Sequence, residues 1–363
     1  MCGIAGILNL SSEKVLGLEK KLNIFNEIQE HRGPDDHNIW AHRDLSLGFA
    51  HRRLSIIDLE DGVQPMKDRD GNCLTFNGEI YNYIELQKRI GRRSFETKSD
   101  TEVILKAYQK WGLDCVQKFR GMFSFALWDE KQKTLFCARD FFGIKPFYYT
   151  VSKGHLYFAS EIKALLPFVD EIETDTSALR EYLSFQFVLG EKTLFKNIYQ
   201  LPPGHMLIAK DGQINIKKYW DVYYNLDNDH TEKYFEEKLQ FLLEDSLKIH
   251  TRSDVPIGGY LSGGLDSSTI CAIANNLKET DFVGFTGKFS DGAQYDESKY
   301  AQLVADRENF DLEVLDIKAS DFVDNIRKVI YHLDYPVAGP GSFSQYMISK
   351  TASKRRKVLL GGQ

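Results

Sequence analysis

The sequence lacks the features of a membrane or secreted protein. No apolar run approaches the length of about 20 residues that a membrane-spanning helix needs. The N-terminal residues MCGIAGILNL lack the basic leader and the cleavage site of a signal peptide. The 5 cysteines form no CxxC pair, and their odd number argues against a disulfide framework. We therefore expect a reduced, cytoplasmic protein with no membrane partner.

An excess of positive charge is missing as well. Lysine and arginine total 46 against 52 acidic residues, which gives a formal net charge of −6. Domains that bind nucleic acid are usually distinctly basic, so a nucleic-acid partner is not expected. The 9 histidines show no HxxxH pair or other metal-ligand spacing, and this argues against a zinc site.

The chain of 363 residues is long enough for two domains, and its pattern changes once. In the first predicted domain, residues 2–218, short apolar strands alternate with tight turns, which is typical of antiparallel hairpins. Residues 219–231 are polar and rich in turn formers, as in a linker. From residue 232 strands and helices alternate, which predicts a parallel sheet covered by helices. The sequence stops after the last predicted strand, where ligand loops of such sheets lie, so we expect the second domain, 232–363, to be incomplete.

Cys2 is the first candidate for chemistry, because it directly follows the initiator methionine. Removal of that methionine leaves a free α-amine on the cysteine itself. An α-amine has a pKa of about 8, so it can act as the general base for the neighbouring thiol, as in N-terminal nucleophiles. The alternative is that Cys2 is a small buried hydrophobic residue.

Five further residues have the chemistry that a glutamine-hydrolysing site needs. The amide of Asn77 and the backbone N–H of Gly78 follow a predicted strand and can form an oxyanion hole. Arg53 can pair with the substrate α-carboxylate, and Glu79 and Asp100 can hold its α-ammonium group. Each residue also has a structural explanation: a turn for the Asn-Gly-Glu segment, a surface ion pair for the arginine and a helix cap for the aspartate.

Together, these residues lie in a series of motifs that is more specific than any one of them. In chain order the motifs are MCGIAGI, HRGPD, HRRLSI, FNGEIYN, SDTEVIL, GMFSFALWD, ARDFFGIKPFYY and FASEIKALL. The first domain thereby resembles the class II glutamine amidotransferase domain. The resemblance implies an α+β N-terminal-nucleophile fold, an αββα sandwich, with Cys2 as nucleophile and Asn77 and Gly78 as oxyanion hole. It implies a glutamine site formed by Arg53, Leu54, Ile56, Asn77, Glu79 and Asp100, and a supporting loop at residues 31–35.

A second motif, SGGLDSS at residues 262–268, lies between an apolar strand and a predicted helix. Backbone N–H groups at a helix N-terminus attract anions, glycines let the backbone wrap a phosphate, and serines donate hydrogen bonds to it. No GK[ST] follows, so the motif is not a Walker loop. A strand–helix turn with good capping residues is the alternative.

This motif resembles the pyrophosphate loop of ATP pyrophosphatases. In this order, the two halves of the chain resemble the glutamine-hydrolysing asparagine synthetase family, and LPPGH, FVGFTGKF, YDESKYA and SFSQYMISKTASKRRKVLLGGQ match it as well. The resemblance implies an α/β parallel-sheet domain of the adenine nucleotide α-hydrolase type that uses ATP and Mg²⁺, with Asp266 as metal ligand. The implied ATP-binding residues are Leu261, Ser262, Gly263, Gly264, Asp266, Ser267, Ser268, Val283, Gly284, Gly361 and Gly362. Asp296 and Glu297 are weaker candidates, because helix capping explains them equally well.

The implied activity is that of a ligase that forms C–N bonds with glutamine as amide donor. Glutamine is hydrolysed at Cys2, ATP adenylates aspartate, and the ammonia converts this intermediate to asparagine. The family also suggests a homodimer. Its acidic Gly-Asp-Glu segment and its distal lysine are not in this sequence. Three alternatives therefore stay open: another carboxylate acceptor, glutaminase activity alone, and a non-catalytic module that binds glutamine and nucleotide.

Overall fold

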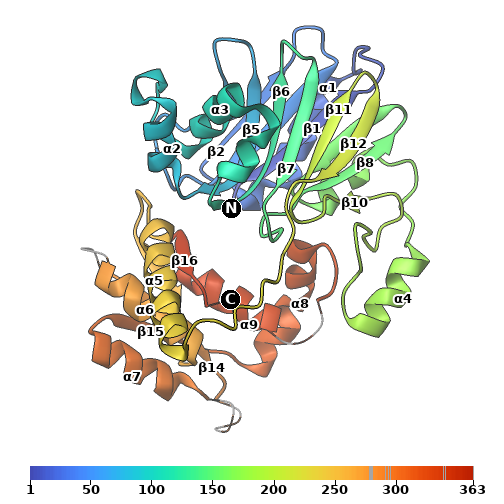
Figure 1. Ribbon diagram of the computed structural model, residues 1–363. Coiled ribbons are helices and arrows are strands. Elements are labelled where there is room, and N and C mark those ends of the chain that lie inside the picture. The colour runs from blue at the N-terminus through green and yellow to red at the C-terminus, as the bar shows by residue number, and fades with distance from the viewer. Residues whose placement is uncertain are drawn as a thin grey trace. The chain divides into compact units, whose positions relative to one another are not determined.

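The structure is a computed structural model of the chain (Figure 1). It describes residues 1–277, 281–290, 292, 294, 296–337, 339 and 341–362. The chain forms two compact units, residues 1–223 and 224–363, each of which is treated by itself.

Unit 1 contains two six-stranded sheets, in which the paired strands run antiparallel. The first sheet has the order β10 (Tyr199–Gln200), β8 (Tyr148–Ser152), β9 (His155–Ala159), β1 (Gly3–Asn9), β3 (Leu47–Arg53) and β2 (Asp36–Ala41). The second has the order β12 (Gln213–Lys218), β11 (His205–Lys210), β7 (Thr134–Arg139), β6 (Gly121–Asp129), β5 (Cys73–Ile80) and β4 (Met66–Lys67).

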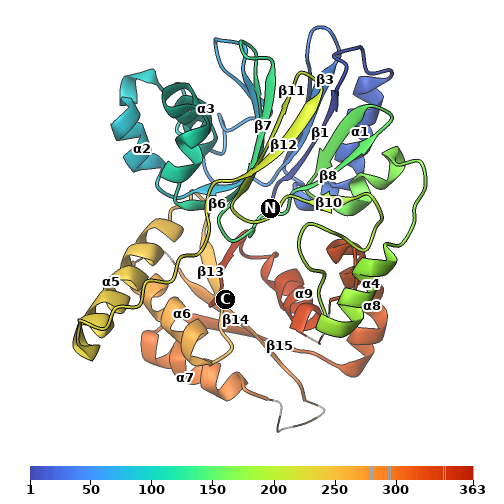
Figure 2. The same cartoon turned by 45° about the vertical axis from the view of Figure 1, so that its right-hand side comes forward.

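The two sheets pack face to face, and helices cover their outer faces (Figure 2). Strand β6 shows why, because its side chains alternate: Phe125 and Leu127 pack under the helices, whereas Ala126 and Trp128 pack against the other sheet. The helices of unit 1 are α1 (Leu18–Ile28) on the first sheet, α2 (Tyr83–Ile90) and α3 (Asp100–Trp111) on the second, and α4 (Thr176–Phe185). This arrangement confirms the αββα sandwich.

Unit 2 contains a four-stranded parallel sheet, as the alternation of strands and helices predicted. Its order is β15 (Asp311–Asp316), β14 (Val283–Lys288), β13 (Ile257–Tyr260) and β16 (Val358–Leu360). Its helices are α5 (Glu232–His250), α6 (Leu265–Leu277), α7 (Ser298–Glu308), α8 (Ala319–Leu333) and α9 (Gly341–Ala352). Within the described ranges of the chain, no helix is both long and apolar enough to cross a bilayer.

One predicted helix cap is wrong by one residue. Helix α3 begins at Asp100, but its N-cap is Ser99, whose side-chain oxygen accepts a hydrogen bond from the backbone N–H of Thr101 at 3.1 Å. Because Ser99 caps the helix, the carboxylate of Asp100 can make a different contact, described below.

Candidate functional site

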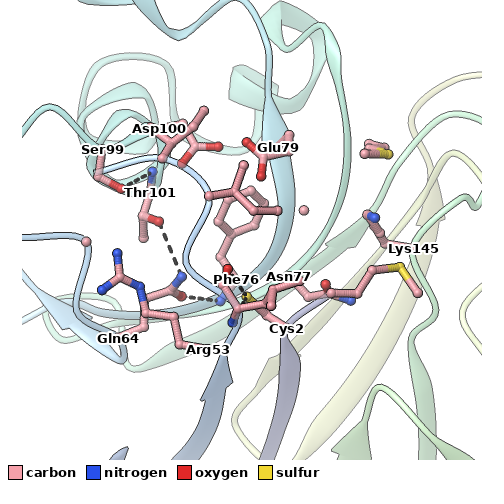
Figure 3. Close-up of a pocket in the computed structure, with 17 residues that line it drawn as sticks. Cys2, Arg53, Gln64, Phe76, Asn77, Glu79, Ser99, Asp100, Thr101 and Lys145 are labelled. Atoms are coloured by element: carbon pink, nitrogen blue, oxygen red, sulfur yellow. Dashed lines mark hydrogen bonds between the residues drawn. The ribbon is translucent and has the colours of Figure 1, made fainter. Parts of the chain in front are cut away.

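A pocket in unit 1, with a volume of about 60 Å³, brings together all the residues that the sequence assigned to the glutamine site (Figure 3). Its wall is formed by Met1, Cys2, Arg53, Leu54, Ile56, Ile57, Gly62, Gln64, Phe76, Asn77, Gly78, Glu79, Ser99, Asp100, Thr101, Met122 and Lys145. These residues come from both sheets and from the start of α3, so only the folded sandwich assembles the pocket.

Cys2 lies just before β1, and the pairing of β1 with β3 places it beside Leu54. The register places Gly3 opposite Arg52, and the backbone N–H of Leu54 donates a hydrogen bond to the Cys2 sulfur at 3.4 Å. Burial raises the pKa of the Cys2 thiol, and the chain terminus and this N–H act in the opposite direction. The thiol therefore has only limited support for its ionised form from its immediate backbone.

A buried ionic cluster fixes the backbone of Cys2. The Nε of Arg32 donates to the Cys2 carbonyl at 2.9 Å, and its Nη1 lies 3.2 Å from the carboxylate of Glu161. Glu161 also contacts His31 at 2.9 Å and Lys163 at 2.7 Å. Burial opposes ionisation of Glu161, but these partners lower its pKa to about 2. The loop at residues 31–35 thus supports the site through Arg32.

Asn77 and Gly78 lie in β5, in the pocket wall. The side chain of Asn77 is fully buried, and neither its amide oxygen nor its amide nitrogen has a hydrogen-bond partner among the described residues. Gly78 has φ +153°, and a Cβ on it would lie 2.1 Å from the carbonyl oxygen of Met122. A buried amide without a partner is costly and is expected where a ligand completes the hydrogen bonds.

Arg53 and Asp100 place opposite charges in the wall of the pocket, and Figure 3 shows them on different sides of it. The guanidinium of Arg53 is positioned by the carbonyl oxygens of Asp58 and Leu59. The carboxylate of Asp100 accepts the backbone N–H of Ile80 at 2.9 Å. Asp100 is 5% exposed, and burial raises its pKa to about 7, although its backbone hydrogen bonds act in the opposite direction.

The pocket wall contains further buried polar residues to which the sequence analysis assigned no role, among them Gln64 and Lys145. Gln64 accepts the N–H of Phe76 at 2.7 Å and lies 3.3 Å from the hydroxyl of Thr101, so it links β5 to α3. Lys145 is 5% exposed, and burial lowers its pKa to about 8, whereas the carboxylate of Glu79 opposes this shift. A lone lysine in the apolar run GIKPFYY was the available signal for Lys145. We find no comparable signal for Gln64.

In unit 2 the second motif forms the loop between β13 and α6. The backbone N–H of Leu261 donates to the carbonyl of Phe285 at 2.9 Å, which fixes the start of the loop beside β14. The hydroxyls of Ser262 and Ser267 lie 2.9 Å apart, so they close the turn between strand and helix.

Two glycines allow close backbone approaches at this loop. Gly263 has φ +84°, and a Cβ on it would lie 2.6 Å from the Cβ of Tyr300. Gly362 follows Gly361 after β16, and a Cβ on it would lie 2.8 Å from the backbone nitrogen of Ser267. Gly362 and the first turn of α6 therefore meet at the carboxyl edge of the sheet.

Other predicted ATP-site residues differ in their surroundings. Ser268 has a buried hydroxyl that lacks a hydrogen-bond partner in the described part of the chain. Gly264 is exposed in the loop. Val283 and Gly284, in contrast, are buried in β14, opposite Gly258 and Gly259. A Cβ on Gly284 would lie 3.4 Å from the Cδ2 of Leu261, so this part of β14 adjoins the start of the loop, as does Phe285.

Asp266 is the predicted Mg²⁺ ligand, and it lies exposed in the first turn of α6. No group of three or more His, Cys, Asp or Glu side chains suited to a metal occurs among the residues with a described placement. A single carboxylate is compatible with Mg²⁺ that is held largely by the phosphates of a nucleotide. The donor set thus fits a metal that arrives with ATP.

Comparisons with known proteins divide the chain at a similar place. Residues 1–220 match the glutamine amidotransferase domain, and residues 238–363 match the asparagine synthase family. An asparagine synthetase (glutamine-hydrolysing) of Bacillus subtilis is 37% identical over 372 residues, which cover 100% of this chain and 57% of the relative. A putative enzyme of the same name from Methanocaldococcus jannaschii is 36% identical, with 100% and 74% covered. An amidase of Gibberella zeae is 31% identical, with 93% and 54% covered.

The first of these relatives is much longer than this chain, which spans little more than half of it. Both matched families lie in the order expected from the motifs, and the resemblance extends over the full chain. The chain belongs to the family of glutamine-hydrolysing asparagine synthetases.

Proposed function

We propose that this chain carries the glutaminase site and the ATP-binding part of the synthetase site of a glutamine-dependent asparagine synthetase. The observation that carries this proposal is the pocket of unit 1, where Cys2 lies with an unsatisfied buried amide, a guanidinium and a buried carboxyl group. Such a set of groups suits an amino acid with a reactive side-chain amide.

The glutaminase step begins with the removal of Met1, which stands in the pocket wall. Its removal frees the α-amine of Cys2 and enlarges the pocket. The amine takes the thiol proton, and the thiolate attacks the side-chain carbonyl carbon of glutamine. The amide of Asn77 and the N–H of Gly78 donate to the oxyanion. The α-ammonium then returns its proton to the leaving ammonia, and water hydrolyses the thioester to give glutamate.

The charged residues select the amino-acid end of the substrate. The guanidinium of Arg53 binds the α-carboxylate, with Leu54 and Ile56 beside it, and the carboxylates of Glu79 and Asp100 hold the α-ammonium group. This assignment accounts for the buried carboxyl group of Asp100 in the pocket wall, because the substrate ammonium group would offset the cost of ionising it.

In unit 2, ATP is the proposed substrate of the loop at residues 261–264. Backbone N–H groups of this loop and of the first turn of α6 would bind its phosphates, aided by Ser267 and Ser268. Gly361 and Gly362 let the end of β16 approach the nucleotide. When bound, Mg²⁺ offsets the phosphate charge, and Asp266 would hold it. Val283 and Gly284 would shape the nucleotide site beside Leu261, which Gly284 adjoins.

The acceptor proposed for the whole protein is aspartate, which ATP adenylates and ammonia converts to asparagine. A second candidate is another carboxylate acceptor, because a protein that is not named an asparagine synthetase is also similar to this chain, over 93% of its length. The two candidates share the glutaminase chemistry and differ only in the product.

The test follows the label from amide-¹⁵N glutamine in one incubation with ATP, Mg²⁺ and aspartate. We expect ¹⁵N-asparagine from the protein that carries a complete synthetase domain. Label in ammonia alone would contradict aspartate as the acceptor, but it would still support glutamine hydrolysis by unit 1. Label that stays in glutamine would contradict the proposed function as a whole.

Cys2→Ala is the matched variant for this test. Because it removes the nucleophile, glutamine hydrolysis should fall by a factor on the order of 1000 or more. Asparagine formation from free ¹⁵N-ammonium should continue, since the change leaves unit 2 untouched. Full glutamine hydrolysis by the variant would refute the assignment of Cys2.

A further inference from the structure

Lys145 is a buried cation that the glutaminase chemistry described above does not use. It lies in the loop between β7 and β8, is 5% exposed, and lines the same pocket as Cys2 (Figure 3). Among the residues that the structure describes, its ammonium nitrogen forms no hydrogen bond or ion pair. A buried charge without a close partner is costly, so its presence in a pocket calls for an explanation.

The backbone holds Lys145 in place. The carboxylate of Asp140 accepts four backbone N–H groups, from Phe123 at 3.2 Å, Phe142 at 3.1 Å, Ile144 at 2.9 Å and Lys145 at 2.9 Å. The Nε of Arg139 donates to the Lys145 carbonyl at 2.8 Å.

Through the hydrogen bonds of Asp140, the loop that contains Lys145 is fixed to β6 and so to β5, the strand that contains Asn77 and Gly78. Phe123 belongs to β6, and β6 pairs with β5 so that Phe123 lies opposite Gly78. The backbone from which the Lys145 side chain extends is therefore fixed relative to Asn77 and Gly78.

Three charged groups act on the Cys2 sulfur: the chain terminus and the side chains of Glu79 and Lys145. Arg32 is already committed to the Cys2 carbonyl and to Glu161. Glu79 disfavours a thiolate. Among the described residues, one backbone N–H donates to the sulfur, at 3.4 Å, so a second cation would further offset the cost of a buried thiolate.

We propose that Lys145 supports the nucleophile of the glutaminase site. Its buried ammonium group stabilises the Cys2 thiolate after the α-amine has taken the thiol proton. It acts through Cys2 and not through contact with glutamine. The inference rests on the proposed function in one respect, namely that Cys2 is the nucleophile.

The experiment measures alkylation of Cys2 by iodoacetamide across a range of pH, read as the mass of the N-terminal peptide after removal of Met1 has been verified. We expect Lys145→Met to raise the midpoint of the alkylation profile by about one pH unit, which is a tenfold lower rate near neutral pH. Lys145→Arg keeps the positive charge and should restore the wild-type midpoint. Glutamine hydrolysis by Lys145→Met should show a lower kcat with little change in KM.

Lys133→Met is the control, because Lys133 does not line the pocket and pairs with Glu130 instead. Its alkylation profile should match that of the wild type. Lys145→Gln provides a second neutral variant if Lys145→Met fails to fold, as judged by its thermal melt.

An unchanged midpoint in a folded neutral variant would overturn the proposal. An equal shift in Lys145→Arg would overturn it too, because packing and not charge would then be the cause. A wild-type protein that hydrolyses no glutamine, while its alkylation profile still depends on Lys145, would contradict the proposed function and not the charge effect.

Discussion

Asp100 illustrates how one residue acquires a functional environment from its neighbours. Ser99 caps α3, so the Asp100 carboxylate can accept the N–H of Ile80 and line the pocket. Burial raises its pKa to about 7, well above the value near 3.9 of an unfolded chain. Ionisation of Asp100 therefore costs stability as the pH rises from about 4 to 7, and a bound ammonium group offsets that cost.

Glutamine binding should for this reason depend on pH. Below pH 7 Asp100 is protonated and cannot balance the substrate ammonium group, so KM should rise by a factor that approaches about 10 for each pH unit. Near pH 7, binding to the inactive Cys2→Ala variant should release protons, which calorimetry in buffers of different ionisation enthalpy detects.

Asp100→Asn is the control for this prediction. It should bind glutamine weakly, with no proton release, and should lose no stability at pH 8, because the buried charge is gone. Proton release that persists in Asp100→Asn would assign the titration to another group.

At the level of elements, the pairing of β5 with β6 leaves room for only a glycine at the predicted oxyanion hole. A Cβ on Gly78 would lie 2.1 Å from the Met122 carbonyl oxygen and 2.7 Å from the Cα of Phe123. Both atoms belong to the backbone of β6, which is paired on both sides and bound by Asp140, so it cannot move aside cheaply.

Gly78→Ala should consequently lower the rate of glutamine hydrolysis by about 100-fold or more and destabilise unit 1 by about 1–3 kcal/mol. Steady-state kinetics and a denaturant titration measure the two effects. Gly341→Ala is the control, because a methyl group there meets no atom of the described residues within 4 Å. Wild-type kinetics in Gly78→Ala would show that the backbone N–H of Gly78 does not contact the oxyanion.

On the scale of the whole molecule, the two units have separate hydrophobic cores. The core of unit 1 lies between and outside its two sheets, whereas unit 2 packs its helices on its own parallel sheet. All the residues proposed for the glutaminase site lie in unit 1. Folding and glutamine hydrolysis should therefore be properties of that unit.

The fragment 1–223, produced with Met1 removed, should fold cooperatively and hydrolyse glutamine with a kcat/KM within about threefold of the intact chain. Circular dichroism and a glutamate assay measure these properties. A soluble, folded fragment with no activity would show that unit 2 contributes to the glutaminase site.

The elements, the two folds and the residues with obvious chemistry could be predicted from the sequence. The nearly continuous apolar run in GMFSFALWD indicates a strand buried on both faces, and SGGLDSS indicates an anion-binding turn, because side-chain pattern and backbone preference act over a few residues. For the same reason Cys2, Asn77 and the SGGLDSS loop could be proposed from short motifs.

Which of these residues meet, and what surrounds them, depends on the tertiary structure. The sulfur of Cys2 contacts Leu54, and Asp100 contacts Ile80, through strand pairings that no local pattern records. The roles of Lys145 and Gln64 in the pocket and the burial of Val283 came from the fold alone. Burial and charge act through space, and the chain distance between two residues does not reveal how close the fold brings them.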